Sequence, residues 1–396
     1  MKFNKLSQLF LVSSIGLLVS SLLISCAITT IDYVFVASSS GSGTSTEGQI
    51  QTFAVDSESG ALRTGLPPAD SGGINPVAMV TTSDYANLYV ANKTSGTVTH
   101  FTIAYSGKLT AQSDQISIPA PVALAVNTAG TYLYVVSGTT SATLSEYALS
   151  SGTISAPASP VVSVPLAISS DVIVPAGITV LANTSTVSGN GIYVAVADQS
   201  SNLGYVFGFT VGSSGALTAT ASSPYQAGVQ PSGIASDPTD RFVYVTDFAN
   251  NDMIGYTILD GSTLSFMTGG PFATGNQPSA IVVDPRGEYI YVTNSLDSTV
   301  SNYAITLANG IPTAVVNTNS ANIATDSDPV ALAIDPALGR FIYTANHLGN
   351  SVSGFLLNPN SGAISPTQAT PYPAGYRPSA VAVIPHGNHA TESVTP

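Results

Sequence analysis

Short runs of alternating apolar and polar residues cover most of the chain. Between Tyr289 and Ile305, a run rich in Tyr, Ile, Val and Thr is followed by a polar turn and a second run of the same kind. Alternation with a period of two, in β-branched and aromatic residues, predicts a β-hairpin. A single hairpin is only marginally stable in water, so the pattern indicates that this hairpin belongs to a larger sheet structure.

The hairpin pattern recurs seven times at intervals of 45 to 59 residues. Its first strand reads VFVAS (34–38), LYVAN (88–92), LYVVS (133–137), IYVAV (192–196), VYVTD (243–247), IYVTN (290–294) and IYTAN (342–346). Each copy continues with a second aromatic strand and a turn of the SG type. An apolar strand then follows, led by Pro76, Pro121, Pro175, Pro231, Pro278, Pro329 or Pro378. Repeats of this length with four strands each predict the blades of a β-propeller.

The order of strands within a blade follows from their composition. The Pro-led strand is a continuous apolar run, which favours the inner position with both faces buried. Turns beginning with Asp-Pro at 237, 284 and 335 connect it to the YV-type strand, since Pro suits the second position of a type I turn. We therefore predict an all-β fold: a single seven-bladed propeller with four antiparallel strands per blade.

The two ends of the repeat array complete one another. The first copy lacks a Pro-led strand before Tyr33, and the last Pro-led strand, 378–384, has no YV-type strand after it. We expect these strands to pair in one blade, which would close the ring and remove two open edges. The propeller then spans residues 33–387, followed by a tail at 388–396. The Gly-, Ser- and Thr-rich insertions 39–50 and 183–191 are expected to be surface loops.

The YVTN-type strands, the DPxG-type turns and the SGxL turns resemble those of the seven-bladed lactonase-type propellers, the YVTN and 6-phosphogluconolactonase-like superfamily. The similarity covers about residues 33 to 387 and concerns strand and turn motifs. For the enzymes of that superfamily, the resemblance implies an Arg-His pair directly after the Pro that opens an inner strand, with a second His four residues on. No copy in this chain has a His at those positions.

The charge balance restricts the partners. Only 8% of the residues are charged, and 9 basic against 22 acidic residues give a net charge of −13. Nucleic acids and anionic membrane surfaces require a basic face, so both are excluded as partners of the ring.

The N-terminus has the pattern of a lipoprotein signal peptide. Lys2 and Lys5 precede an apolar run from Leu9 to Ile24, which ends in Leu-Ile-Ser-Cys26, and Cys26 is the only cysteine of the chain. This ending resembles the bacterial lipobox, whose Cys is acylated after cleavage. We expect a signal peptide at 1–25 and a lipidated tether at 26–32. The protein would be anchored in the cell envelope, in the outer membrane of a Gram-negative host; a chance Cys is the alternative.

Candidate ligand-binding residues lie where the loops after the YV-type strands and before the Pro-led strands meet at one central mouth. They are Asn92, Lys93, Asp247, Asn294, Asp328, Asn346, His347 and Arg377. Asn and Asp after a strand are also typical turn caps. Turn capping therefore remains the alternative role of Asn92, Asp247, Asn294 and Asn346. His347 and Arg377 are the main cationic groups expected at the mouth, where they could bind an anion. No metal site is expected, because the oxygen-rich run 247–252 lacks the spacing of a calcium loop.

Three function classes follow from these observations. The sequence favours a non-catalytic binding or scaffold module, a monomeric propeller that holds a small molecule, a glycan or an envelope protein at its mouth. A lactone hydrolase is the alternative that the resemblance implies. A redox propeller is disfavoured, since the chain has no haem-attachment motif and no Trp, so no cofactor is expected.

Overall fold

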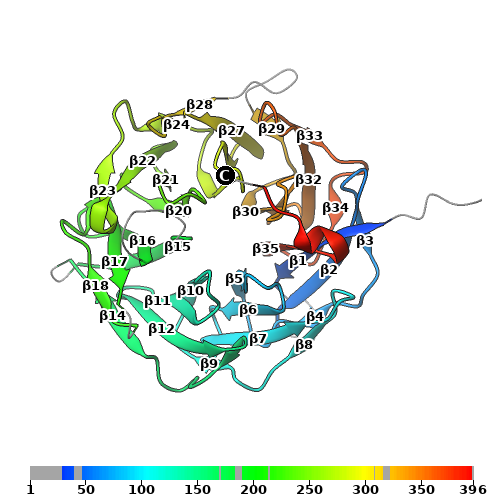
Figure 1. Ribbon diagram of the computed structural model, residues 1–396, viewed down its shortest axis with the longest axis horizontal. Helices are drawn as coiled ribbons and strands as arrows, with labels where there is room; N and C mark the ends of the chain where they lie inside the picture. The colour runs from blue at the N-terminus through cyan, green and yellow to red at the C-terminus, as the bar shows by residue number, and fades with distance from the viewer. Residues whose placement is uncertain are drawn as a thin grey trace, which may run out of the picture.

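The structure is a computed structural model that describes residues 29–39, 47–168, 171–182, 190–212, 215–306, 308–314 and 322–394. Its strands form seven antiparallel sheets, which Figure 1 shows side by side around one central axis. The single seven-bladed propeller predicted from the repeats is confirmed. No helix in these ranges has the length and apolar character needed to cross a membrane. The expected signal peptide, Cys26 and most of both expected surface loops lie outside the described residues.

We number the blades along the chain and give their strands from the axis outward. Blade 1 contains β35 (Pro378–Pro385), β1 (Thr30–Ser38), β2 (Gln49–Asp56), β3 (Leu62–Thr64) and β4 (Ala69–Asp70). Blade 2 contains β5 (Pro76–Thr81), β6 (Asn87–Asn92), β7 (Thr97–Ile103), β8 (Leu109–Ala111) and β9 (Ile116–Ser117). Blade 3 contains β10 (Pro121–Val126), β11 (Tyr132–Ser137), β12 (Ala142–Ser150), β13 (Thr153–Ile154) and β14 (Val162–Leu166).

The remaining blades repeat this order. Blade 4 contains β15 (Ile173–Val180), β16 (Asn190–Asp198), β17 (Leu203–Val211), β18 (Leu217–Ala219) and β19 (Tyr225–Gln226). Blade 5 contains β20 (Pro231–Ser236), β21 (Phe242–Asp247), β22 (Asp252–Leu259), β23 (Thr263–Phe266) and β24 (Phe272–Ala273). Blade 6 contains β25 (Pro278–Val283), β26 (Tyr289–Asn294), β27 (Thr299–Ile305), β28 (Pro312–Ala314) and β29 (Asn322–Ala324). Blade 7 contains β30 (Pro329–Ile334), β31 (Phe341–Asn346), β32 (Ser351–Leu357), β33 (Ile364–Pro366) and β34 (Tyr372–Pro373).

The outermost position of each blade is shared by two short strands instead of one. In blade 5, β23 pairs with the end of β22 and β24 pairs with its beginning. Between them lies Thr-Gly-Gly-Pro at 268–271, and Gly and Pro interrupt strands because they weaken or lack the ladder hydrogen bonds. Each sheet therefore has five strands in four positions.

Blade 1 closes the ring as predicted. Its second strand β1 comes from the N-terminal part of the chain and its inner strand β35 from the C-terminal part. Their register places Tyr33 opposite Ile384 and Val36 opposite Val381. This pairing starts one residue earlier than expected, at Asp32 opposite Pro385.

The distribution of burial corrects one expectation. The second strand of a blade, such as β26, is buried along its whole length, whereas the Pro-led inner strand β25 is half-buried at most positions. The prediction of an inner strand buried on both faces is therefore wrong for blades 2, 5, 6 and 7, whereas β35 of blade 1 is buried at all but one position. An inner strand is the edge of its sheet nearest the axis, and outside its own sheet it contacts the inner strands of the two neighbouring blades and, as β25 does with β21, a neighbouring second strand.

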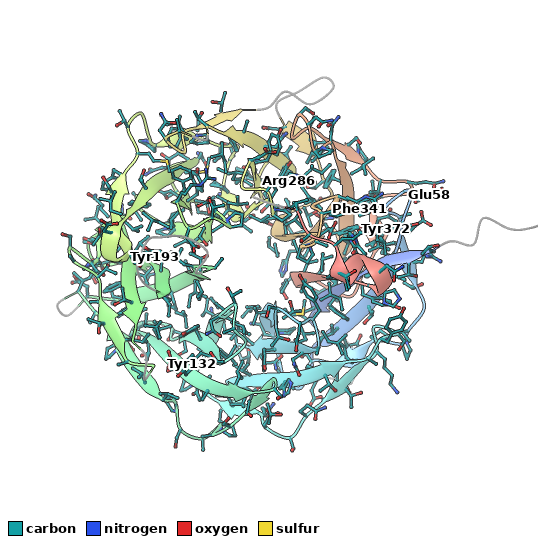
Figure 2. All side chains as sticks on the ribbon, viewed as in Figure 1. Glu58, Tyr132, Tyr193, Arg286, Phe341 and Tyr372 are labelled. Atoms are coloured by element: carbon teal, nitrogen blue, oxygen red, sulfur yellow. The ribbon has the colours of Figure 1, made fainter. Side chains whose placement is uncertain are left out.

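The repeated motifs themselves join neighbouring blades. The hydroxyl of Tyr343 in β31 donates to the carbonyl of Gly60 in the SG turn of blade 1, at 2.8 Å. Tyr244 makes the same bond to Gly310 of the next blade at 2.6 Å. Seven apolar clusters, one between each pair of neighbouring blades, fill the ring wall, and Figure 2 shows side chains occupying the space between the sheets. The YV and SG motifs are thus explained by packing.

The two ends of the ring differ in the connections that they carry. The turns from the second to the third strand, with the segments that lead into the inner strands, form one end, which we call the mouth face. The turns between the inner and second strands form the other end, the DP face. The 3-10 helix η2 (Gly387–Thr391) contacts β1 and β35 beside the DP face, and Figure 1 shows it in red over blade 1.

Candidate functional site

Four of the predicted mouth residues end their second strands and are fully buried: Asn92, Asp247, Asn294 and Asn346. The carboxylate of Asp247 accepts the backbone N–H groups of Val229 and Gln230 at 2.7 and 3.0 Å. Asn346 donates to the hydroxyls of Ser351 and Ser353 at 3.0 and 2.9 Å. These side chains hold the turns of their own blades together, and they do not present free polar groups to a ligand.

The other four residues remain at the mouth surface on successive blades. Arg377 is exposed, and its guanidinium lies 5.3 Å from the ring centroid of Tyr376. His347 and Asp328 are half-buried and adjacent, since the backbone N–H of His347 donates to the carbonyl of Asp328 at 2.7 Å. Lys93, also half-buried, lies on blade 2. The structure thus brings Asp328, His347 and Arg377 together where blade 7 meets blade 1.

The ring of His347 has a structural contact of its own. Its Nδ1 lies 3.2 Å from the carbonyl oxygen of Pro378, the first residue of the next inner strand. In blades 5 and 6, a Ser hydroxyl donates to the corresponding Pro carbonyl: Ser232 to Pro278 at 2.5 Å and Ser279 to Pro329 at 2.6 Å. Blade 7 has Val330 at that position. His347 therefore supplies the link between blades that Val330 cannot make.

A pocket of about 480 Å³ opens on the mouth face between blades 4 and 5. It includes the starts of both inner strands, the turn after β16 and the turn after β21. Its polar and aromatic lining comprises Asp198, Gln199, Asn202, Gln230, Ser232 and Phe248. The three amides are exposed and Phe248 is half-buried. None of these residues was among the ligand-binding candidates chosen from the sequence.

Asp198 is the only acidic or basic residue of this lining. Its carboxylate accepts the hydroxyl of Ser201 and the backbone N–H of Ser200, the latter at 2.8 Å. These hydrogen bonds hold the pKa of Asp198 below its ordinary value, the Ser201 hydroxyl contributing most. A carboxylate of low pKa is a weak base, so the pocket has hydrogen-bonding groups and an aromatic surface but no group suited to proton transfer at neutral pH.

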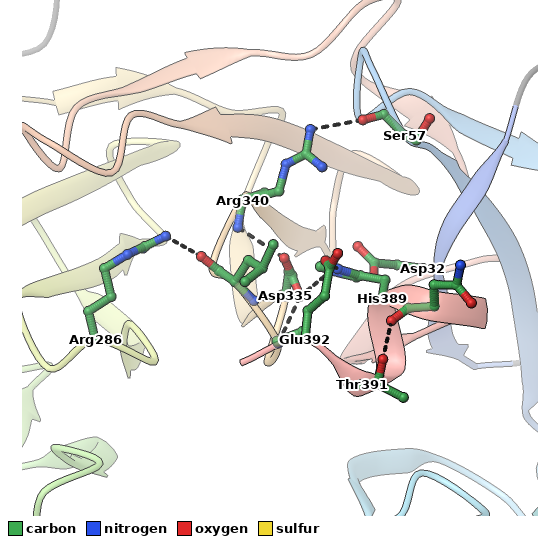
Figure 3. A network of polar contacts seen from close by, with 11 residues as sticks. Asp32, Ser57, Arg286, Asp335, Arg340, His389, Thr391 and Glu392 are labelled. Carbon is green, nitrogen blue, oxygen red and sulfur yellow. Dashed lines mark hydrogen bonds and ion pairs between the residues drawn. The ribbon is translucent and has the colours of Figure 1, made fainter. Parts of the chain in front are cut away.

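A second polar cluster, which no motif of the sequence predicted, lies beside the DP face. Asp32 of β1, Asp335 of the turn after β30, and His389 of η2 are all buried. His389 Nε2 lies 3.1 Å from Asp335 Oδ1 and 3.4 Å from Asp32 Oδ1, and its Nδ1 lies 2.6 Å from Glu392 Oε2. Figure 3 shows the four side chains side by side. His389 falls in the segment that was expected to be a tail, and only the folded C-terminus brings it to the ring.

The charges of this cluster depend on one another. Burial and the neighbouring carboxylate of Asp335 raise the pKa of Asp32 to about 8, although the charges of His389 and Arg340 oppose this. Burial alone would lower the pKa of His389, but its hydrogen bonds to Asp335 and Glu392 outweigh this and raise it to about 9. With nothing else bound, His389 is therefore a cation at neutral pH that balances buried negative charge.

Comparisons with known proteins agree with this architecture. The lactonase family of seven-bladed β-propellers matches residues 27–127 and 205–383, and no curated protein matches the chain. Among solved structures, the periplasmic gluconolactonase of Pseudomonas aeruginosa superposes with a TM-score of 0.71 at 19% identity, covering 90% of this chain and 99% of that one. A candidate 6-phosphogluconolactonase of Bacteroides fragilis gives a TM-score of 0.68 at 17% identity, with coverages of 90% and 99%.

At such low identity, the similarity to these two solved structures shows a shared fold and does not show a shared activity. The family match is broader evidence, because it includes strands from all seven blades and leaves out only β11 to β16, the first residues of β17 and the end of β35. It also includes the closing strand β1 and most of β35. The chain belongs to the lactonase family of seven-bladed β-propellers.

Proposed function

We propose that the protein is a binding propeller that holds a polyhydroxylated small molecule, of the sugar or sugar-lactone class, in the mouth-face pocket between blades 4 and 5. The observation that carries this proposal is the pocket lining. The exposed side-chain amides of Gln199, Asn202 and Gln230 can each donate and accept a hydrogen bond. Phe248 offers an apolar face against which a sugar ring can pack.

The same lining argues against catalysis in this pocket. Ester hydrolysis needs a base that activates water and a cation or donor that stabilises the oxyanion. The pocket has no His, Lys or Arg in its lining, and Asp198 is a weak base. His347 and Arg377 lie in the region of blades 7 and 1, away from this pocket.

Lactone hydrolysis is the second candidate, and family membership favours it. Its site would be Asp328, His347 and Arg377, where His347 could act as a base through Nε2 while Arg377 holds the oxyanion. The departure from the family pattern after each inner-strand Pro weighs against this candidate.

Binding and turnover measurements separate the two candidates. We expect sugars or aldonolactones to bind the purified protein in calorimetry, and Phe248→Ala to weaken binding about tenfold, which corresponds to about 1.4 kcal/mol. Leu296→Ala is the matched control, because Leu296 is an exposed apolar residue in the mouth-face turn of blade 6. Turnover of 6-phosphogluconolactone or simple γ- and δ-lactones that disappears in His347→Ala or Arg377→Ala would instead establish the hydrolase.

We also propose that the ring is held in the cell envelope through a lipid on Cys26. The described chain begins at Thr29, whose carbonyl accepts the N–H of Ser57 beside the DP face. From there β1 runs towards the mouth face, where the N–H of Ser39 contacts the Arg377 carbonyl. A lipid just upstream would place the DP face towards the membrane, with the mouth face directed away from it and open to a ligand.

Replacement of Cys26 tests the anchor. We expect Cys26→Ser to move the protein from the membrane fraction to the soluble fraction, because stable anchoring depends on the acyl chains. Ser25→Ala, which leaves the Cys in place, is the matched control and should stay in the membrane fraction. A Cys26→Ser protein that is still processed and still carries lipid would refute the anchor.

A further inference from the structure

Three distant parts of the chain meet at the buried cluster of Asp32, Asp335 and His389. Asp32 lies near the start of β1, Asp335 in the turn between β30 and β31, and His389 in η2. The cluster therefore joins blade 7, blade 1 and the C-terminal segment at the place where the ring closes. Neither the mouth-face pocket nor the proposed lipid anchor uses it.

Two of the three distances between the donor atoms are those of metal ligands. His389 Nε2 lies 3.1 and 3.4 Å from the nearest oxygens of Asp335 and Asp32. One ligand atom from each residue can be chosen so that all three lie within 4.8 Å of one another. Ligand atoms at about 2.1 Å from a metal lie about 3.0 to 3.4 Å apart in octahedral or tetrahedral arrangements.

Asp32 points independently to a ligand. Its side chain is fully buried, and neither carboxylate oxygen has a hydrogen-bond partner among the described residues. The closest polar approach within that part of the chain is that of His389 Nε2, at 3.4 Å. A buried carboxylate without hydrogen bonds is costly to the folded state, and coordination of a cation would remove that cost.

Comparison with the equivalent turns shows that blade 7 is the exception. In blades 5 and 6, the turn carboxylates pair with arginines: Asp237 with Arg241 at 2.9 Å and Asp284 with Arg286 at 3.2 Å. In blade 7, the Arg340 guanidinium donates to the carbonyl of Ser57 at 3.0 Å, and Figure 3 shows it directed to that carbonyl. Asp335 is left facing Asp32 and His389.

The surroundings orient the donor atoms. Asp335 is fixed by the N–H groups of Ala337 and Arg340, at 2.9 and 3.0 Å. Glu392 Oε2 can accept the Nδ1–H of His389 at 2.6 Å, which leaves the Nε2 lone pair directed between the two aspartates. A carboxylate on the outer nitrogen of a ligating His is the usual support of such a ligand.

From this geometry we infer that Asp32, Asp335 and His389 bind a divalent transition-metal ion of the zinc type, which fastens the C-terminal segment to the closing blade. One imidazole with two carboxylates suits zinc better than the all-oxygen sites of calcium or magnesium. Metal binding displaces the proton of Asp32 and the Nε2 proton of His389 to solvent. The three carboxylates, Glu392 included, and the Arg340 guanidinium then sum to −2, which a divalent cation neutralises. Water from the adjacent pocket of about 530 Å³, lined by His389 and Glu392, completes the coordination.

Metal titration of the full chain tests the site. After treatment with a chelator, calorimetry should show one Zn²⁺ bound per chain, with no comparable binding of Ca²⁺ or Mg²⁺, and Zn²⁺ should raise the Tm. Asp32→Asn and His389→Gln should abolish this binding. Asp284→Asn, at the equivalent turn position of blade 6, is the matched control and should retain it. Absence of Zn²⁺ binding by the wild-type chain would overturn the inference, and so would binding that survives both ligand substitutions.

Co²⁺ absorption provides a second measurement, which remains informative if the Asp32 and His389 variants fail to fold. Co²⁺ bound by the wild-type chain should give visible absorption bands of a nitrogen- and oxygen-ligated ion. Glu392→Gln changes a half-exposed side chain and should weaken the affinity 10- to 100-fold without unfolding the protein. Wild-type bands of a thiolate-bound ion, which would assign the metal to Cys26, or an unchanged affinity in Glu392→Gln, would contradict the assignment.

Discussion

Deletion of residues 377–396 is expected to unfold the whole ring. It removes β35, whose residues Ala380 to Ile384 are all buried. Val381 and Val383 belong to the cluster between blades 7 and 1, and Ala382 and Ile384 to the one between blades 1 and 2. Burial of each Val or Ile contributes about 1.5–3 kcal/mol. The loss of three such residues approaches the roughly 5–15 kcal/mol by which a domain is stable, and the edge of β1 becomes exposed.

Thermal unfolding followed by circular dichroism checks this expectation, together with the soluble yield. A deletion of residues 386–396 is the matched control, because it removes η2 and leaves β35 complete. The control should still unfold cooperatively, at a lower Tm, since it loses His389 and its contacts. A soluble 377–396 deletion with an unchanged Tm would contradict the role of the closing strand.

The fold could be predicted because its repeated motifs have a repeated physical task. A Tyr in a second strand and a Gly in an SG turn recur together because they form a hydrogen bond between neighbouring blades. The Tyr hydroxyl donates to the Gly carbonyl, as Tyr343 does to Gly60. Asp in a DP turn recurs because its carboxylate binds the following backbone N–H groups, as Asp284 does with Glu288 and Tyr289. The number of blades and the closing pair follow from counting these motifs.

The sites could not be predicted in the same way, because they lie where the repeat is broken. The mouth-face pocket uses Gln199, Asn202 and Gln230, which stand at turn positions that carry no common motif. Asn92 and its equivalents, which the motifs make conspicuous, are buried and hold turns. The cluster of Asp32, Asp335 and His389 joins residues more than 300 positions apart with a segment that has no strand pattern. Only the folded path of the C-terminus reveals it.

One buried acid in the ring wall should make stability depend on pH. Glu146 in β12 is fully buried, and in the described part of the chain neither carboxylate oxygen has a hydrogen-bond partner of normal geometry. Burial raises the pKa of Glu146 to about 7, against an ordinary value of 4.5, and the contact with Tyr134 only partly opposes this. Burial and the Glu146 carboxylate raise the pKa of Tyr134, which lies beside the pocket between blades 3 and 4, so its phenol stays neutral. Among the described residues, no cation acts on Glu146 to compensate its ionisation.

Glu146→Gln is consequently expected to stabilise the protein at neutral and alkaline pH. A raised pKa means that the folded state keeps its proton longer than the unfolded state. The native chain then has its full stability below about pH 4.5 and loses it as the pH rises to about 7. The amide does not ionise, so the difference in unfolding free energy between variant and native chain should be near zero at pH 4.5. It should grow to about 2–3 kcal/mol at pH 8, because each pKa unit corresponds to about 1.4 kcal/mol. Chemical denaturation at several pH values measures this difference.

Glu58→Gln is the matched control, since it removes the same charge from an exposed turn, where Figure 2 shows Glu58 at the rim. This substitution should change stability by less than about 0.5 kcal/mol. A difference for Glu146→Gln that does not vary with pH, or a loss of stability at pH 8, would mean that the carboxylate is ionised and paired in the folded protein.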